Sequence, residues 1–244
     1  MDADEYRRLV DATESHWWFA ATTALLELFA RPHLDRVGPL ARCLDAGGGT
    51  GATGSWLARR AWTVLGEIEP VAIDAAVARY PYHAVQADLN ELPFGDAQFD
   101  LVMCVTALCH EMNVDPANTV AEFARVLRPG GCLLLLEPHH QWLWRGHDRI
   151  THTARRFNLP TLRQLAGDAG LEVERATGAF TFLVPPALAM RFLERGKTSS
   201  DVGRNESGGG GLGTKLAFLE RKFLARRNSV FGLSAVILAC KPNA

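Results

Sequence analysis

Apolar and polar positions change period repeatedly along the middle of the chain. Short apolar runs of strand length alternate with longer stretches in which apolar residues recur at helical spacing. The predicted strands lie near 41–46, 62–67, 83–87, 99–106, 132–137, 171–176 and 233–240. The predicted helices between them lie near 52–60, 70–79, 116–128 and 160–169. This alternation predicts an α/β fold, a doubly wound and mostly parallel sheet of seven strands with helices on both faces.

Two regions lie outside this alternation. Residues 4–31 predict an N-terminal helix, which Pro32 and then Gly38-Pro39 should end. A long connection precedes the last strand, with helical runs near 186–195 and 214–227 and a Gly- and Ser-rich stretch at 196–213 that we expect to be a mobile loop. We therefore expect a single domain, made of a helical cap (1–38), a core (39–177), an insertion (178–230) and a last strand (231–244).

Composition and charge limit the classes of protein that remain. The 244 residues are 48% hydrophobic and 22% charged, as in ordinary globular domains. A net charge of −1 gives no support for a nucleic-acid partner. No apolar run reaches the ~18 residues of a membrane span, and the acidic first residues do not resemble a signal peptide. We expect a cytoplasmic protein.

The cysteines give a second indication of compartment. There are 5 of them, an odd number, and no pair has CxxC spacing. This pattern predicts neither a disulfide framework nor a zinc knuckle. Most of the cysteines lie in apolar, strand-like runs, so we expect buried thiols in a reducing cytoplasm.

The segment Leu44–Gly51, LDAGGGTG, carries the strongest functional signal. It follows the first predicted strand and opens a helix. Glycines let the backbone turn sharply and approach a ligand, and a helix N-terminus offers free N–H groups. Glu67 and Asp88 end the next two apolar runs. The carboxyl ends of parallel strands share one sheet edge, where ligands bind in open α/β sheets. The pattern predicts a site there for a cofactor that contains a nucleoside.

Two cofactor classes fit this loop. Residues 49–54 match GxGxxG, the dinucleotide fingerprint, with Glu67 or Glu69 as the ribose ligand. The longer pattern LDAGGGTG, with Asp45 two residues before the first glycine, resembles motif I of the class I S-adenosylmethionine (SAM) methyltransferases. The segments VLRPGG at 126–131 and QADL at 86–89 resemble the turn before that family's fifth strand and its adenine loop.

The ends of the chain resemble one small-molecule subgroup of this family. Residues 14–19, ESHWWF, are similar to its N-terminal His-Trp-Trp-Phe segment, and residues 144–157 and 231–234 are similar to two later segments. The chain departs from the subgroup at Ala20-Ala21, where a basic pair is expected, and by one extra residue between His152 and the Arg pair.

The resemblance implies a Rossmann-like fold and a cofactor site for SAM, with S-adenosylhomocysteine as product. Glu67 would accept from both ribose hydroxyls, with Glu69 as the alternative, and Asp88 would accept from the adenine amino group unless it only caps a turn. Aromatic cover would come from Trp17 or Trp18. The implied cofactor-binding residues are Asp45, Gly47, Gly49, Gly51, Glu67, Asp88, Leu89 and Trp17.

Five of the eight histidines lie between 110 and 152, after the fourth and fifth strands. His110 is the first candidate for a general base or for a group that orients the acceptor, because imidazole titrates near neutral pH. The further catalytic candidates are His140, Asp148 and His152. A metal site built from these histidines with Glu137 or Asp148 is a weaker alternative, since no spacing matches a known site such as HExxH. A structural role is the alternative for every histidine.

The acceptor side is assigned to residues 139–157 and to the insertion. The candidate substrate-binding residues are Trp18, Arg155, Arg156 and Phe182. They predict methyl transfer to a small molecule, foremost to a hydroxyl or carboxyl oxygen in specialised metabolism. The alternatives are an N- or C-methyltransferase, a SAM-binding protein that does not methylate, and an NAD(P)-dependent oxidoreductase. The insertion would equally serve as the interface of a homodimer.

Overall fold

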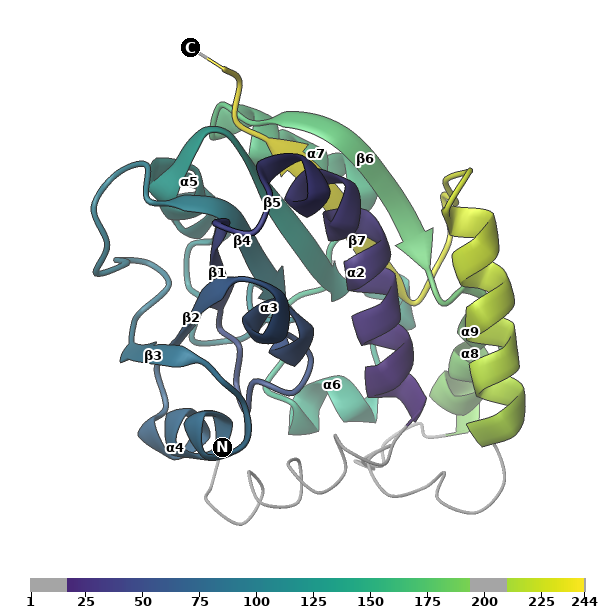
Figure 1. Ribbon diagram of the computed structural model, residues 1–244. Coiled ribbons are helices and arrows are strands. Elements are labelled where there is room, and N and C mark those ends of the chain that lie inside the picture. The colour runs from purple at the N-terminus through teal and green to yellow at the C-terminus, as the bar shows by residue number, and fades with distance from the viewer. Residues whose placement is uncertain (1–16, 194–209, 244) are drawn as a thin grey trace.

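The computed structural model describes residues 17–193 and 210–243 of the chain. Its centre is one seven-stranded sheet with the strand order β3-β2-β1-β4-β5-β7-β6 (Figure 1). Strand β7 runs antiparallel to both of its neighbours, and the other pairs are parallel. The predicted α/β fold with a mostly parallel sheet is confirmed. The strands are β1 (Arg42–Ala46), β2 (Trp62–Glu67), β3 (His83–Gln86), β4 (Phe99–Val105), β5 (Leu127–Pro138), β6 (Glu172–Ala179) and β7 (Ser234–Cys240).

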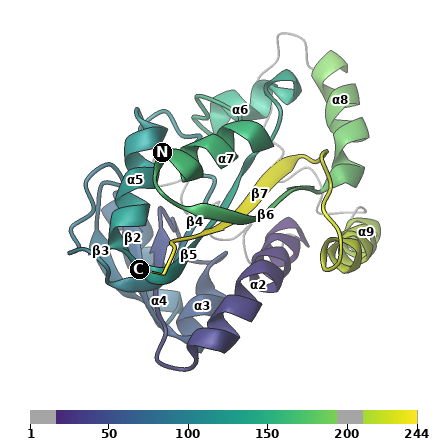
Figure 2. The ribbon, with the colours of Figure 1, turned by 90° about the horizontal axis from the view of Figure 1, so that it is seen from above.

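Helices cover both faces of the sheet (Figure 2). One face carries α2 (Trp17–Val37), α3 (Ser55–Arg60) and α4 (Pro70–Arg79). The other face carries α5 (Pro116–Val126) and α7 (Leu159–Asp168). The remaining elements are α6 (Gly146–Ile150), α8 (Val184–Leu193), α9 (Gly210–Leu224) and two 3-10 turns at Gln141–Leu143 and Thr181–Leu183. Helix α9 packs beside α2.

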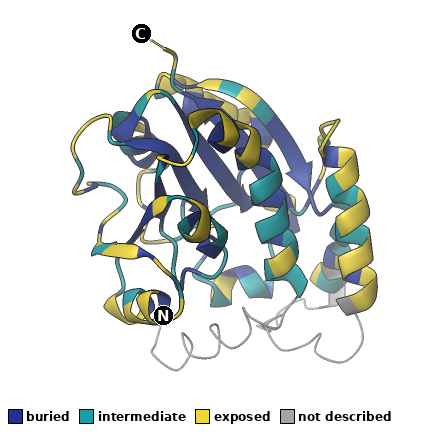
Figure 3. Ribbon diagram, viewed as in Figure 1, coloured by how far each residue is buried: buried dark blue, intermediate teal, exposed yellow. Residues whose placement is uncertain are grey.

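The central strands form the core of the molecule (Figure 3). Successive side chains of a strand point to opposite faces, so β5 contributes to two apolar layers. Leu133 and Leu135 belong to the layer under α5 and α7, whereas Leu134 and Leu136 belong to the layer under α2. Both faces of β5 are buried, which explains its continuous run of leucines rather than an alternating pattern.

The parallel strands bring their carboxyl ends to a single edge of the sheet. In Figure 1 the arrowheads of β4 and β5 point down, toward α6 and the first turn of α2. The loops after β1, β2, β4 and β5 therefore share this edge, which we call the carboxyl edge. It is the edge at which the sequence places the cofactor.

Several predicted boundaries are wrong. The helix predicted at 214–227 is α9, which begins at Gly210, inside the segment predicted as a loop, because glycine weakens a helix without preventing it. Helix α2 continues through Pro32 to Val37. Proline costs a helix about 3 kcal/mol, but the next two residues, His33 and Leu34, are buried against the sheet. The helix predicted at 116–128 ends at Val126, and Leu127 already pairs with Phe99, so β5 begins five residues before the predicted 132.

The expected absence of disulfides is also wrong. Cys132 and Cys240 form a disulfide, whereas Cys43, Cys104 and Cys109 are free and buried, as predicted for core thiols. Strands β5 and β7 place Cys132 directly opposite Cys240. The two residues are 108 positions apart, so only the register of the sheet brings them together.

Several expectations concern residues outside the described part of the chain. The start of the N-terminal helix, residues 14–16 of the ESHWWF segment, and most of the loop predicted at 196–213 fall within 1–16 and 194–209. Within the described residues, no helix has the length and apolar character that crossing a membrane requires.

Candidate functional site

The glycine loop after β1 has a backbone that only glycine adopts readily. Gly47, Gly49 and Gly51 have φ values of +67°, +56° and +76°. A Cβ on Gly47 would lie 2.7 Å from Cβ of Ala107, in the loop after β4, whereas a Cβ on Gly49 would meet no heavy atom within 4 Å. The loop is therefore packed against the protein at Gly47 and borders open space at Gly49.

Glu67 lies directly against the glycine loop. It is the last residue of β2 and is 8% exposed. Its Oε2 accepts from the Gly49 N–H at 2.9 Å, and its Oε1 accepts from the N–H groups of Ile68 and Glu69 at 2.8 and 3.1 Å. Three backbone donors fix the carboxylate at the end of the strand. Glu69, the alternative ribose ligand, is the N-cap residue of α4.

Asp45 lies beneath the glycine loop rather than in the open space. It is 2% exposed, and its Oδ2 accepts from the Tyr82 hydroxyl at 2.7 Å. The same hydroxyl lies 3.0 Å from the carbonyl oxygen of Gly51. A Cβ on Gly54 would lie 2.0 Å from Oδ2 of Asp45, so this glycine is needed for space. Asp45 therefore orders the loop, and Tyr82 is a partner that the sequence analysis did not identify.

Burial raises the pKa of Asp45 to about 7, and the negative charge of Glu67 acts in the same direction. The folded protein therefore holds this proton more tightly than the unfolded chain, in which the ordinary value is 3.8. The resulting stability is fully present below pH 3.8 and is lost as the pH rises through about 7. We expect Asp45→Asn, which keeps a hydrogen bond to Tyr82, to flatten this part of the pH profile of urea unfolding. An unchanged slope between pH 5 and 8 would contradict a shifted Asp45.

Asp88 and Leu89 follow β3 at the same edge. Asp88 is exposed, and its Oδ1 accepts from the N–H and the side-chain amide of Asn90, both at 2.8 Å. Asp88 therefore caps a turn, the alternative role considered for it. Leu89 lies under the glycine loop, because its Cδ1 would be 3.2 Å from a Cβ on Gly47. This contact brings the loop after β3 next to the loop after β1.

His110 lies in the loop after β4, where the sequence places the acceptor. Its Nδ1 accepts from the N–H of Met112 at 3.3 Å, so the proton of the neutral ring is on Nε2. Burial and the neighbouring His152 lower its pKa, while the charge of Glu111 acts in the opposite direction. His152 is itself bonded to Glu111, with 2.8 Å between Nδ1 and Oε1. The His110 ring is thus a hydrogen-bond donor at neutral pH.

Glu137, near the end of β5, fixes the loop after β4, which contains His110 and which we call the histidine loop. It is fully buried, and its two oxygens accept from the N–H groups of Leu108 and Cys109 at 3.0 and 3.1 Å. Burial raises the pKa of Glu137 to about 7. The sequence suggests Glu137 only as a metal ligand. Its place near the end of a predicted strand indicates that it lies at the carboxyl edge, but the sequence does not show that it binds the N–H groups of Leu108 and Cys109.

His139 and His140 continue from β5 into the carboxyl edge. Their rings lie 3.6 Å apart, and His140 stacks on Trp142 at 4.9 Å. Burial lowers the pKa of both, that of His139 to about 3, so both rings are neutral at pH 7. Within the described part of the chain, His139 Nδ1 and His140 Nε2 are buried without a hydrogen-bond partner. A bound molecule with a polar atom would satisfy such groups.

Asp148 and Arg156 form a buried ion pair. Arg156 Nε and Nη2 donate to the two Asp148 oxygens at 2.8 and 2.9 Å, and the Arg145 N–H donates to Asp148 Oδ2 at 2.9 Å. Arg156 Nη1 also donates to the His139 carbonyl oxygen at 3.1 Å. This pair anchors the segment after β5 and leaves Asp148 with no free oxygen.

The neighbouring Arg155 is also used within the chain. Its Nη1 donates to the carbonyl oxygen of Asn113 and, at 3.4 Å, to that of Leu108. The geometry therefore gives both arginines of the pair a positioning role around the histidine loop. The assignment of Arg155 and Arg156 to substrate binding stays a prediction.

An aromatic cluster lies at the start of α2. The Trp18 ring lies 4.2 Å from that of Phe180, and the Trp17 ring lies 6.2 Å from that of Phe182. A Cβ on Gly213 of α9 would lie 2.9 Å from the Trp17 ring. The cluster thus joins α2, α9 and the turn after β6, and it brings together both tryptophans and the Phe182 of the predicted site.

Backbone strain concentrates near the same edge. Among the described residues, five non-glycine residues have positive φ, and four of them follow the strands of the carboxyl edge: Thr106, His140, His152 and Phe180. Such conformations cost about 1–3 kcal/mol each and accumulate at functional sites. They support the assignment of the site on grounds that do not depend on any sequence motif.

Comparison with known proteins agrees with this geometry. Residues 44–135 match the model of a methyltransferase domain. The chain is 31% identical over 179 residues to a probable SAM-dependent methyltransferase of Mycolicibacterium smegmatis, covering 71% of this chain and 66% of the relative. It is 34% identical over 125 residues to a demethylmenaquinone methyltransferase of Mycobacterium tuberculosis, covering 51% of this chain and 48% of the relative. The chain thus spans about two thirds and one half of these relatives.

A solved structure extends the likeness to the whole fold. A putative methyltransferase, solved in complex with the Haloferax volcanii Trm112 methyltransferase activator, matches 99% of this chain over 96% of its own length. The TM-score is 0.66 at 22% identity, which is a likeness of fold. Fold, glycine loop and relatives together define a Rossmann-like enzyme domain that uses SAM. The chain belongs to the class I SAM-dependent methyltransferases.

Proposed function

We propose that this protein transfers a methyl group from SAM to a small-molecule acceptor, foremost to an oxygen atom. The observation that carries the proposal is the open space beside Gly49, with Glu67 hydrogen-bonded to the Gly49 N–H at its border. A buried carboxylate is held there by three backbone N–H groups, at the strand end where a ribose diol would need an acceptor. This placement supports Glu67 rather than Glu69 as the ribose ligand.

The residues present fit SAM. Gly49 leaves room for a ligand, and Glu67 offers carboxylate oxygens to the ribose hydroxyl groups. Asp88 and Leu89 lie in the loop after β3, beside the glycine loop, where the adenine would bind. When bound, SAM supplies a methyl group on a sulfonium, which is a good leaving group. Positioning can then provide much of the acceleration, since holding reactants in line is worth up to ~7–11 kcal/mol in favourable systems.

The acceptor side is formed by histidines and aromatic rings. His110 carries its proton on Nε2 and so donates to an acceptor oxygen, which favours an orienting role over that of a base. The buried His139 Nδ1 and His140 Nε2 offer further polar contacts. Apolar surface comes from Trp17, Trp18 and Phe182. One relative is named for demethylmenaquinone, which is consistent with an acceptor that has a large apolar part and keeps C-methylation as the alternative.

Titration calorimetry with S-adenosylhomocysteine tests the cofactor, with NAD⁺ and NADP⁺ run in parallel. We expect binding of S-adenosylhomocysteine alone. Gly49→Ala should abolish it, because the new methyl group enters the proposed site. Gly38→Ala is the matched control, since Gly38 also has positive φ and open space around it but lies outside the carboxyl edge. Equal binding by both variants, or binding of a nicotinamide nucleotide instead, would contradict the proposal.

Replacement of His110 tests the acceptor assignment. His110→Ala should lower turnover of an oxygen acceptor by about 10-fold, the loss of one orienting hydrogen bond, without changing the affinity for S-adenosylhomocysteine. His110→Gln, which keeps a donor, should recover part of the rate. An unchanged turnover in His110→Ala would remove His110 from the reaction.

The identity of the acceptor stays a prediction. The aromatic cluster around Trp17 and Phe182 supports binding of the acceptor on the α8–α9 side of the molecule.

The homodimer also stays a prediction. Size-exclusion chromatography with light scattering would test it directly.

A further inference from the structure

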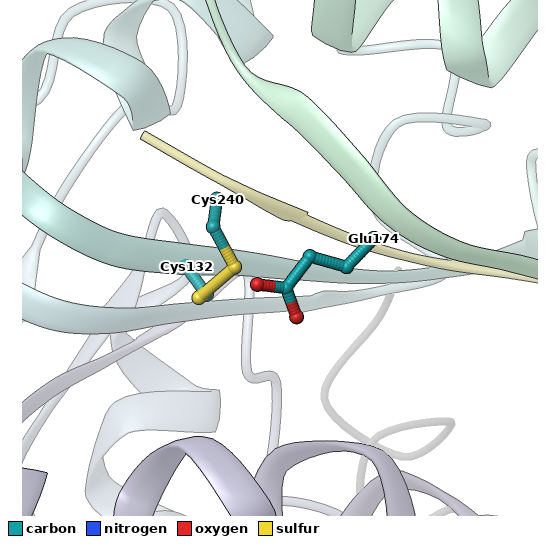
Figure 4. Close-up of side chains that lie close together, drawn as sticks. All are labelled: Cys132, Glu174 and Cys240. Carbon is teal, nitrogen blue, oxygen red and sulfur yellow. A yellow bond between two sulfur atoms is a disulfide. The ribbon is translucent and has the colours of Figure 1, made fainter. Parts of the chain in front are cut away.

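A second cluster of reactive side chains lies at the sheet edge opposite the glycine loop. Cys132, Glu174 and Cys240 come from β5, β6 and β7, and one sulfur or oxygen atom of each lies within 4.8 Å of the other two (Figure 4). Among the described residues, this is the one group of three or more His, Cys, Asp or Glu side chains with such spacing. The proposed methyl transfer uses none of them.

The position of Glu174 results from an irregularity in the sheet. In the pairing of β6 with β7, Val173 lies opposite Ala239 and Arg175 lies opposite Leu238, so Glu174 is an extra residue. A bulge of this kind re-aims a side chain. Here it brings an exposed glutamate next to two cysteines, of which Cys132 is fully buried and Cys240 is 8% exposed. Glu174 thus lies between solvent and the buried sulfur atoms of Cys132 and Cys240.

A histidine from α2 lies beside Cys132. His33 is 2% exposed, and its Nδ1 lies 3.2 Å from Sγ of Cys132. Its Nε2 lies 2.8 Å from the carbonyl oxygen of Asp100, and because a carbonyl only accepts, Nε2 carries the proton. Its Nδ1 accepts from Nη2 of Arg36 at 3.4 Å. His33 is not among the side chains whose ligand atoms all lie within 4.8 Å of one another, so it borders the cluster without being one of its ligands.

We propose that Cys132, Cys240 and Glu174 form a site for a tetrahedral divalent cation, foremost Zn²⁺, in the reduced protein, with water as the fourth ligand, and that the disulfide is the metal-free, oxidised form of this site. Two sulfurs, one carboxylate oxygen and a water are donors that suit Zn²⁺. Two sulfurs on one zinc lie about 3.8 Å apart, which only the reduced pair can reach. The proposal does not depend on the methyltransferase activity.

The change between the two forms balances as a thiol exchange. A dithiol reductant delivers two electrons and two protons to the disulfide and leaves as its own disulfide, so two cysteine thiols are formed. Each thiol releases its proton to solvent as the metal binds, and the metal keeps its charge throughout. Thiol-reducing compartments disfavour disulfides, so the metal form is the one expected in a cytoplasm.

Cobalt titration of the full chain tests the proposal, since Co²⁺ is a coloured substitute for Zn²⁺. The protein is reduced with a dithiol, freed of reductant without air, and titrated with Co²⁺. We expect one equivalent to bind with a thiolate-to-cobalt charge-transfer band and tetrahedral d–d absorption, and Zn²⁺ to displace it. The oxidised protein should bind none. A reduced protein without the charge-transfer band, or equal binding by both forms, would overturn the proposal.

Single variants then assign the ligands. Cys132→Ser and Cys240→Ser should each abolish the charge-transfer band, and circular dichroism reports whether each variant is folded. Glu174→Gln should weaken Co²⁺ binding at least ~10-fold. Glu172→Gln is the matched control, because it removes an exposed carboxylate from the same strand outside the cluster. Equal weakening by both glutamine variants would overturn the assignment of Glu174 as a ligand.

Discussion

Replacing Glu67 by alanine should weaken S-adenosylhomocysteine binding about 100-fold. A carboxylate that accepts from two ribose hydroxyls contributes hydrogen bonds to a charged group, which are worth about 1.5–3 kcal/mol each. The variant also leaves the N–H groups of Gly49, Ile68 and Glu69 without their acceptor, so the glycine loop loses a fixed partner. Calorimetric titration measures the loss directly.

Two further variants separate the charge from the geometry. Glu67→Gln keeps one acceptor oxygen and should retain part of the affinity. Glu69→Gln is the control for the neighbouring carboxyl and should bind almost as well as the original chain, because Glu69 only begins α4. A larger loss in Glu69→Gln than in Glu67→Gln would exchange the two roles.

The sequence was sufficient for features that depend on local pattern. Helix α7 begins at Leu159, with Pro160 in its first turn, and Gly170 follows the helix with positive φ. Both residues are typical of helix limits, and the predicted range 160–169 differs from the observed one by a single residue at each end. The glycine loop was located in the same way, because its positive φ values are ones that glycine adopts readily and other residues rarely do.

Features that depend on register or distant packing were not accessible in this way. Tyr82 reaches Asp45 across 37 positions, and Glu137 reaches Leu108 across 29, so neither pair has a sequence spacing that could reveal it. The partner of Arg156 shows the same limit. An Arg pair in a candidate acceptor segment suggests that a bound anion pairs with it. Whether a carboxylate of the protein pairs with the arginine instead, as Asp148 does with Arg156, depends on the fold.

Removal of the Asp148 carboxylate should cause one of the largest losses of stability among single substitutions in the chain. Both oxygens of Asp148 accept from Arg156, and both side chains are buried. Asp148→Ala leaves an unpaired guanidinium in the interior, which costs about 3–5 kcal/mol of the free energy of unfolding. At about 2–4 °C per kcal/mol for a chain of this size, thermal unfolding should begin roughly 10 °C lower.

The exposed pair between Asp96 and Arg125 provides the comparison. Its aspartate side chain is 79% exposed, so Asp96→Ala should cost under ~1 kcal/mol. The double substitution Asp148→Leu with Arg156→Met should recover much of the loss, because apolar replacement of a buried pair is often neutral. Asp148→Asn distinguishes support from catalysis. We expect this variant to lose stability and turnover together, because the ion pair holds Arg156 against the carbonyl oxygen of His139. A variant that kept the stability of the original chain but lost turnover would show that Asp148 acts on the reacting groups.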